Sequence, residues 1–128
     1  MERDPENGEI LYELIGGVSP AVASGTYRGA TFEFRARWDN WDFVLTSSTA
    51  YPACVLEGLC AYDLDRIQRS EKPYPSGLIE AFKDAFVRKG GYGAPNSWAA
   101  SYMPADQIRR LVRELIAEYE GRRTSGCS

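Results

Sequence analysis

The sequence predicts an α+β fold, an antiparallel β-meander of about four strands with helices packed on one face. Two observations carry this prediction. Residues 30–48 alternate between apolar and polar side chains, as a strand pair with one buried face does. Residues 76–89 and 104–120 repeat apolar side chains at helical spacing, so each forms a helix with one apolar stripe. We expect these helices to cover the apolar face of the sheet.

Residues 30–48 form a predicted β-hairpin. With Asp39 and Asn40 as the two-residue loop, Trp38 faces Trp41 and Arg37 faces Asp42 across the strands. The expected apolar face is Phe32, Phe34, Trp38, Trp41, Phe43 and Leu45. The opposite face carries Thr31, Glu33, Arg35, Arg37, Asp42 and Thr46, with Val44 as its one apolar member. This second face is therefore expected to be solvated.

The chain before the hairpin supplies one helix and one strand in this interpretation. Asp4, Pro5 and Glu6 have the order of a helix N-terminus, and apolar residues follow at helical spacing as far as Gly16, so residues 5–15 are predicted to be a short helix. A first strand is the alternative. Residues 21–27 are predicted to pair with the hairpin through a tight turn at Arg28 and Gly29, which places small residues opposite the phenylalanine rings.

The chain after the hairpin supplies a fourth strand over residues 53–62 and then the two helices. The last helix ends before Gly121, and residues 121–128 are expected to be a flexible tail. No repeat or long linker divides the chain, so residues 1–128 are interpreted as a single compact domain.

The composition limits the function classes. The net charge of −3 and the pI of about 5.0 argue against a general nucleic-acid-binding protein. Histidine is absent, which removes Ser–His and Cys–His nucleophile pairs and most zinc sites, so no catalytic residue, metal or cofactor is predicted. Cys54 and Cys60 lie in one apolar stretch and are expected to be buried thiols. With neither a secretory signal nor a membrane span visible, the predicted location is cytoplasmic.

Residues 90–103 are the first candidate for recognition. This connection is longer than those that usually join two helices, and loops of such length often bind partners. The candidate binding residues in it are Tyr92, Asn96, Trp98 and Tyr102. The alternative is that Trp98 and Tyr102 pack into the core, as large aromatic side chains usually do.

Two charged groups are further candidates. Arg35 and Arg37 are able to clamp a phosphate or carboxylate, although neighbouring acids would neutralise them on a solvated face. Glu57, Asp63 and Asp65 have spacing compatible with Mg²⁺, but acids beside a helix start are far more often caps.

The sequence as a whole favours a non-enzymatic protein that recognises one macromolecular partner, most simply another protein. A bacterial or phage accessory factor of the inhibitor or immunity type has this size and charge, an analogy that rests on nothing finer. The alternative is a protein that holds a planar phosphorylated molecule between aromatic and arginine side chains. A carboxylate-dependent enzyme is a weaker third interpretation. No membrane partner is expected, and self-association is left open.

Overall fold

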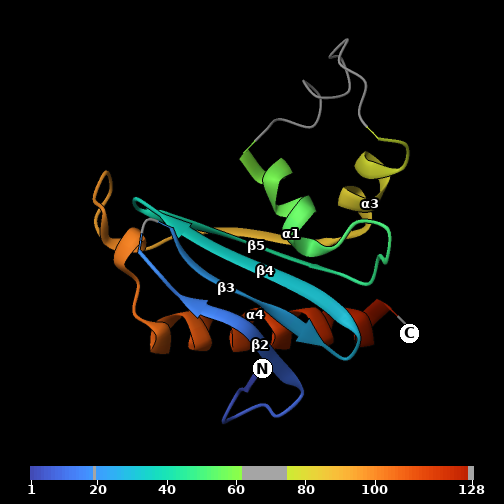
Figure 1. Cartoon of the computed structure of the whole chain (residues 1–128), viewed down its shortest axis with the longest axis horizontal. Coiled ribbons are helices and arrows are strands. Elements are labelled where there is room, and N and C mark those ends of the chain that lie inside the picture. The colour runs from blue at the N-terminus through green and yellow to red at the C-terminus, as the bar shows by residue number, and fades with distance from the viewer. Residues whose placement is uncertain (19, 62–74, 127–128) are drawn as a thin grey trace.

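The computed structural model describes residues 1–18, 20–61 and 75–126, which form an α+β fold around one antiparallel sheet. The six strands lie side by side in chain order (Figure 1). They are β1 (Glu2–Arg3), β2 (Ile10–Gly16), β3 (Ala21–Tyr27), β4 (Ala30–Arg37), β5 (Asn40–Thr46) and β6 (Phe86–Gly91). The predicted fold class is confirmed, with six strands in place of about four.

Helices cover both faces of this sheet. The helical elements are α1 (Ala53–Leu56), η1 (Glu57–Ala61), α3 (Leu78–Asp84), η2 (Ala99–Tyr102) and α4 (Ala105–Gly126). The long helix α4 runs across one face, and α1 and α3 lie over the other (Figure 1). The expectation that all helices share one face is therefore corrected: α3 and α4 lie on opposite sides of the sheet.

The face under α4 carries the main core. Phe34 of β4 is fully buried between Ala23 of β3 and Phe43 of β5, and Ile108 and Val112 of α4 belong to the same cluster. The small residues of β3 leave room for the rings, as predicted. Gly25, opposite Phe32, also has to be glycine because a Cβ there would lie 1.8 Å from the carbonyl oxygen of Leu11.

The opposite face is partly covered rather than solvated. Val44 is fully buried in a second, smaller cluster with Leu56 of α1 and Phe82 of α3. Glu33 and Thr46 on this face are also buried. The lone valine in an otherwise polar strand face was thus the sequence signal that a second layer packs there.

The N-terminal segment is a strand, and the prediction of a helix over residues 5–15 is wrong. The Asp4 carboxylate accepts hydrogen bonds from the backbone N–H groups of Glu6 and Asn7, both at 2.9 Å, and these bonds close a turn. The chain then enters β2 at Ile10. An Asp-Pro pair is compatible with either a helix N-cap or a turn. Because the following residues pair with β3 as strand β2, Asp4 and Pro5 lie in a turn.

Three further element predictions are corrected. Residues 53–61 form α1 and η1 where a strand was expected, and Cys54 is exposed while Cys60 is buried as predicted. The predicted helix 76–89 ends at Asp84, and the chain continues as β6. Helix α4 continues past Gly121 to Gly126. The single-domain interpretation is untested and stays a prediction.

The β4–β5 hairpin turns one residue earlier than predicted. Trp38 and Asp39 form its loop, so Arg37 pairs with Asn40 and Arg35 pairs with Asp42. The strands keep their predicted faces, because the shift moves each partner by two residues. Trp38, however, leaves the core and becomes 55% exposed at the end of the hairpin.

Candidate functional site

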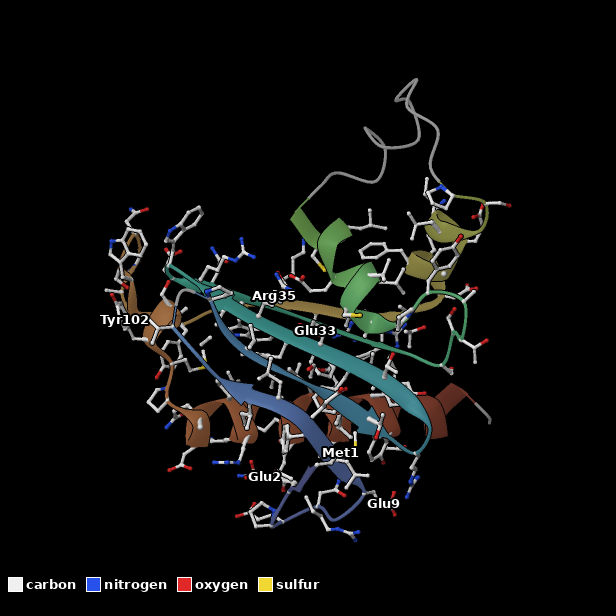
Figure 2. The ribbon with its side chains drawn as sticks, viewed as in Figure 1. Met1, Glu2, Glu9, Glu33, Arg35 and Tyr102 are labelled. Carbon is white, nitrogen blue, oxygen red and sulfur yellow. The ribbon has the colours of Figure 1, made fainter. Side chains whose placement is uncertain are left out.

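Three exposed aromatic side chains gather at one end of the sheet. Trp38, Trp98 and Tyr102 are 55%, 59% and 64% exposed, which is unusual for side chains of this size. We call these three residues the aromatic tip. The rings of Trp38 and Trp98 meet edge to face with centroids 6.3 Å apart. Tyr102 lies at the same end of the strands, where η2 packs against β4 and β3 (Figure 2).

Backbone hydrogen bonds hold the aromatic tip on the scaffold. The Trp38 N–H donates to the Ser101 hydroxyl at 2.8 Å, and the Trp38 carbonyl accepts from the Ala100 N–H at 2.6 Å. The Asp39 carbonyl accepts from the N–H of Tyr92 at 2.8 Å. These bonds stabilise a loop at Trp38 and Asp39 although Trp38 takes a positive φ of 55°. The tip is therefore a fixed surface built from two distant segments.

The loop residues predicted from sequence have different surroundings. Trp98 and Tyr102 are on the surface, so the alternative in which both pack into the core does not describe this structure. Tyr92 is half-buried and packs against the main core. Asn96 is exposed with a φ of 60°, a conformation that asparagine tolerates well, and its N–H donates to the Asp39 carboxylate at 2.7 Å. Their roles in binding stay predictions.

A groove of about 550 Å³ opens beside Trp38 on the face of the sheet opposite α4. Its floor is made by β4, β5 and β6, where Arg35, Asp42 and Lys89 are direct cross-strand neighbours. Residues of η1 line its other side. We call it the polar groove. Its lining consists of Arg35, Arg37, Trp38, Asn40, Trp41, Asp42, Glu57, Gly58, Cys60, Lys89 and Gly90.

Arg35 is engaged within the protein. Its Nε lies 3.1 Å from a Glu57 carboxylate oxygen and 3.5 Å from one of Glu33 (Figure 2 shows Arg35 above Glu33). Burial raises the pKa of Glu33, and the Arg35 charge works against that rise. Arg35 therefore joins β4 to η1 by a partly buried ion-pair network instead of sitting on a solvated face, and it is held in place by two acids.

Asp42 is the least satisfied group of the polar groove. It is hydrogen-bonded to Glu57, yet its Oδ1 is buried and has no hydrogen-bond partner within the described chain. Burial is the main cause that raises its pKa from 3.8 to about 7, followed by the hydrogen bond and the charge of Glu57. Lys89 and Arg35 oppose the rise. A hydrogen bond between two carboxyl groups needs a proton on one of them, and the raised pKa assigns it to Asp42.

Arg37 and Lys89 have no carboxylate partner among the described residues. Arg37 is exposed beside Trp38, and the Lys89 ammonium donates one hydrogen bond to the Cys60 carbonyl. The Cys60 thiol itself is buried, and burial followed by the nearby Asp42 and Glu57 charges raises its pKa to about 12, so it stays protonated. The chemistry that this groove offers is thus donation of hydrogen bonds from two cations.

A larger hollow of about 800 Å³ lies elsewhere, between α3, the segment after β5 and the far part of α4. Its lining carries two basic residues, Lys83 and Arg122, and two acidic ones, Glu80 and Asp84, so the numbers of positive and negative charges are equal. No buried polar atom without a partner faces it within the described part of the chain. Size alone does not make it the better candidate, because binding specificity comes from convergent polar groups.

No group of three or more metal-ligating side chains occurs within residues 1–18, 20–61 and 75–126, and no helix there is long and apolar enough to cross a membrane. Of the acids considered for Mg²⁺, Asp63 and Asp65 lie outside the described residues. No protein-family model, curated protein or solved structure matches this chain. Function is therefore inferred from the geometry of the aromatic tip and the polar groove.

Sequence reasoning missed Trp38, Asp42 and Lys89 as site residues. Trp38 was assigned to the core, and its only distinguishing signal is its place next to the hairpin turn. Asp42 was paired with Arg37 on a solvated face, although Val44 two residues later already argued that the face is covered. Lys89 was placed in a helix, so its position next to Asp42 became visible only with β6.

Proposed function

We propose that this protein is a non-enzymatic binding protein that recognises one protein partner through its aromatic tip. The supporting observation is that Trp38, Trp98 and Tyr102 stay exposed although hydrogen bonds tie the Trp38 backbone to Ala100 and Ser101, which lie between the other two residues. Trp and Tyr are, with Arg, the residue types that contribute most to protein-protein hot spots, and Arg37 adjoins the tip. A rigid aromatic surface loses little conformational entropy on binding.

The size and acidity of the chain accord with an inhibitor or immunity factor of a bacterium or phage. Such a factor needs a preformed surface more than it needs reactive groups. The second candidate is a protein that binds small planar phosphorylated ligands. One observation favours it: Arg37, Lys89 and Trp38 all line the polar groove.

The test is affinity purification of the protein from its native cells, followed by titration of the purified partner against variants. Trp98→Ala is expected to weaken binding about 30-fold or more, the equivalent of about 2 kcal/mol for an aromatic hot spot. Its stability should change by less than about 1 kcal/mol because the side chain is exposed.

Leu14→Ala is the matched control, since Leu14 is also 55% exposed but lies on β2, outside the tip. It should bind as the unaltered protein does. Equal affinity of Trp98→Ala, Trp38→Ala and the control would show that the partner docks elsewhere. Hydrogen exchange separates the two candidates, because a protein partner protects a broad surface, whereas a small ligand protects only the polar groove.

A further inference from the structure

The charges of the polar groove do not balance. Arg35 is matched by Glu33 and Glu57, but Arg37 and Lys89 have no carboxylate partner among the described residues. The remaining acid, Asp42, lies directly across from Lys89 and is the natural counter-ion for it. Its own hydrogen bond to Glu57, however, keeps a proton on the carboxyl pair. The groove therefore has an excess of positive charge.

The geometry of Asp42 supports its neutral form independently. Its Oδ1 is buried and receives no hydrogen bond from the residues that the structure describes. An ionised carboxylate oxygen in that position would lose its hydration without compensation, which is far more costly than burying a neutral carbonyl oxygen. A protonated Asp42 that donates to Glu57 avoids that cost, and it leaves Arg37 and Lys89 without the counter-charge that an ionised Asp42 would supply.

We propose that the polar groove binds one anionic group, a carboxylate or a phosphate, between Arg37 and Lys89. The Arg37 guanidinium offers a planar pair of donors, and the Lys89 ammonium keeps two N–H donors after its bond to the Cys60 carbonyl. The exposed Trp38 ring gives an apolar surface for the rest of the molecule that carries the anion. This site stands on the groove alone and does not depend on a protein partner at the aromatic tip.

Anion binding at this site is linked to the proton of the Asp42–Glu57 pair. When the pair loses its proton, a second negative charge appears next to the bound anion and weakens its binding. Affinity therefore falls as the pH rises through about 7, the range in which Asp42 titrates. The charged and titratable groups that surround Asp42 are Glu33, Arg35 and Arg37 of β4, Glu57 and Cys60 of η1, and Lys89 of β6.

The experiment is a titration followed by NMR of the arginine Nε–H and tryptophan indole signals. The probes are sulfate, as a stand-in for phosphate, and a blocked glutamate peptide, because neither changes its charge between about pH 6 and pH 8. Both should shift the Arg37 and Trp38 signals saturably. Binding should be up to about tenfold weaker at the higher pH. A preference for the peptide points to an acidic side chain of a partner, and a preference for sulfate points to a free phosphorylated molecule.

Variants decide whether the site is the one described. Arg37→Gln and Lys89→Gln together should abolish saturable binding, whereas Arg110→Gln, an exposed arginine of α4, should leave it unchanged. Asp42→Asn should bind equally well at both pH values, since it imitates the protonated form. Absence of saturation at the lower pH, or equal binding by the double variant, overturns the anion site. A pH dependence that persists in Asp42→Asn overturns its link to the proton.

Discussion

Each face of the sheet carries an aspartate with opposite surroundings: Asp4 is buried, whereas Asp42 is half-buried with one buried oxygen. Asp4, on the α4 side, accepts hydrogen bonds from two backbone N–H groups, from the Tyr12 hydroxyl at 3.0 Å and from Arg113 at 3.1 Å. Burial acts to raise its pKa, but these donors outweigh it and hold the pKa below the usual value. Asp42, on the other face, is hydrogen-bonded to the carboxyl group of Glu57, and its Oδ1 has no hydrogen-bond partner in the described part of the chain.

These surroundings give the two carboxyl groups different roles: Asp4 is structural, whereas Asp42 is titratable near neutral pH. A buried carboxylate with a full set of hydrogen-bond donors stays ionised. It links the elements that carry those donors, which for Asp4 are the N-terminal turn, β2 and α4. A buried carboxyl group with too few donors keeps its proton up to neutral pH. The first face is therefore complete without a ligand, while the second carries uncompensated positive charge.

The largest expected effect compares the cores of the two faces. Phe34→Ala should reduce the free energy of unfolding by about 3–5 kcal/mol, because its side chain is fully buried under α4. Phe82→Ala is the same substitution in the smaller cluster, where the short helix α3 is able to relax, and it should cost about 2–3 kcal/mol. Denaturant unfolding measures both. A larger loss of unfolding free energy for Phe82→Ala would show that the smaller cluster contributes more to stability than the main core.

A smaller loss is expected at the satisfied aspartate. Asp4→Asn keeps the size of the side chain but removes the charge that Arg113 faces, and it should cost about 2–3 kcal/mol at neutral pH. Arg113 retains its pair with Glu6, which limits the loss. Because the folded pKa of Asp4 is lowered, its contribution is present at neutral pH and disappears in acid as the carboxylate is protonated. Unfolding of this variant in strong acid should therefore match that of the unaltered protein.

The smallest effect has the opposite sign and belongs to Asp42. A folded pKa raised from 3.8 to about 7 contributes stability below about pH 4, and this contribution is lost as the pH rises through 7. Asp42→Asn cannot ionise, so at about pH 8 it should be more stable than the unaltered protein by about 1–2 kcal/mol, a value discounted for the solvent in the groove.

At about pH 5 this gain should be clearly smaller than at about pH 8, because the contribution is lost progressively between about pH 4 and pH 7, where the unfolded carboxyl group ionises while the folded one keeps its proton. Asp106→Asn serves as the control, since that carboxylate is 94% exposed, and it should show no difference between the two pH values. An Asp42→Asn variant that is destabilised equally at both would mean that Asp42 is ionised in the fold, like Asp4.

The sequence predicted the local pairings well and the second layer poorly. The β3–β4 register follows from a two-residue turn at Arg28 and Gly29, and it was correct in every predicted pair. The β4–β5 register was displaced because Asp39 and Asn40 are the better turn formers in isolation. The actual loop at Trp38 and Asp39 accepts hydrogen bonds from Tyr92 and Ala100 and donates one to the Ser101 hydroxyl. These partners are distant in sequence, so a local sequence pattern does not reveal them.

The candidate site was predictable only in part for the same reason. Trp98 and Tyr102 were recognised from the length and composition of their loop, and Arg35 and Arg37 from their place on the polar face of the hairpin. The polar groove was not predicted, because its walls are η1 and β6. The sequence had predicted a strand over residues 53–62 and a helix over residues 76–89. Short apolar stretches fit either kind of element, and the sheet onto which they pack decides between them.

The chain order of the sheet also has a consequence for the folding route. Strands β3 to β5 are joined by two-residue turns, and β2 lies close to β3 in sequence, so their contacts are local and are expected to form early. Strand β6 joins only after the chain has travelled from Thr46 to Phe86, which makes its pairing with β5 the entropically most demanding step of the sheet. Lys89 reaches Asp42 through that pairing. The polar groove should therefore be assembled last, and amide exchange at its β6 wall should report openings that leave the α4 face closed.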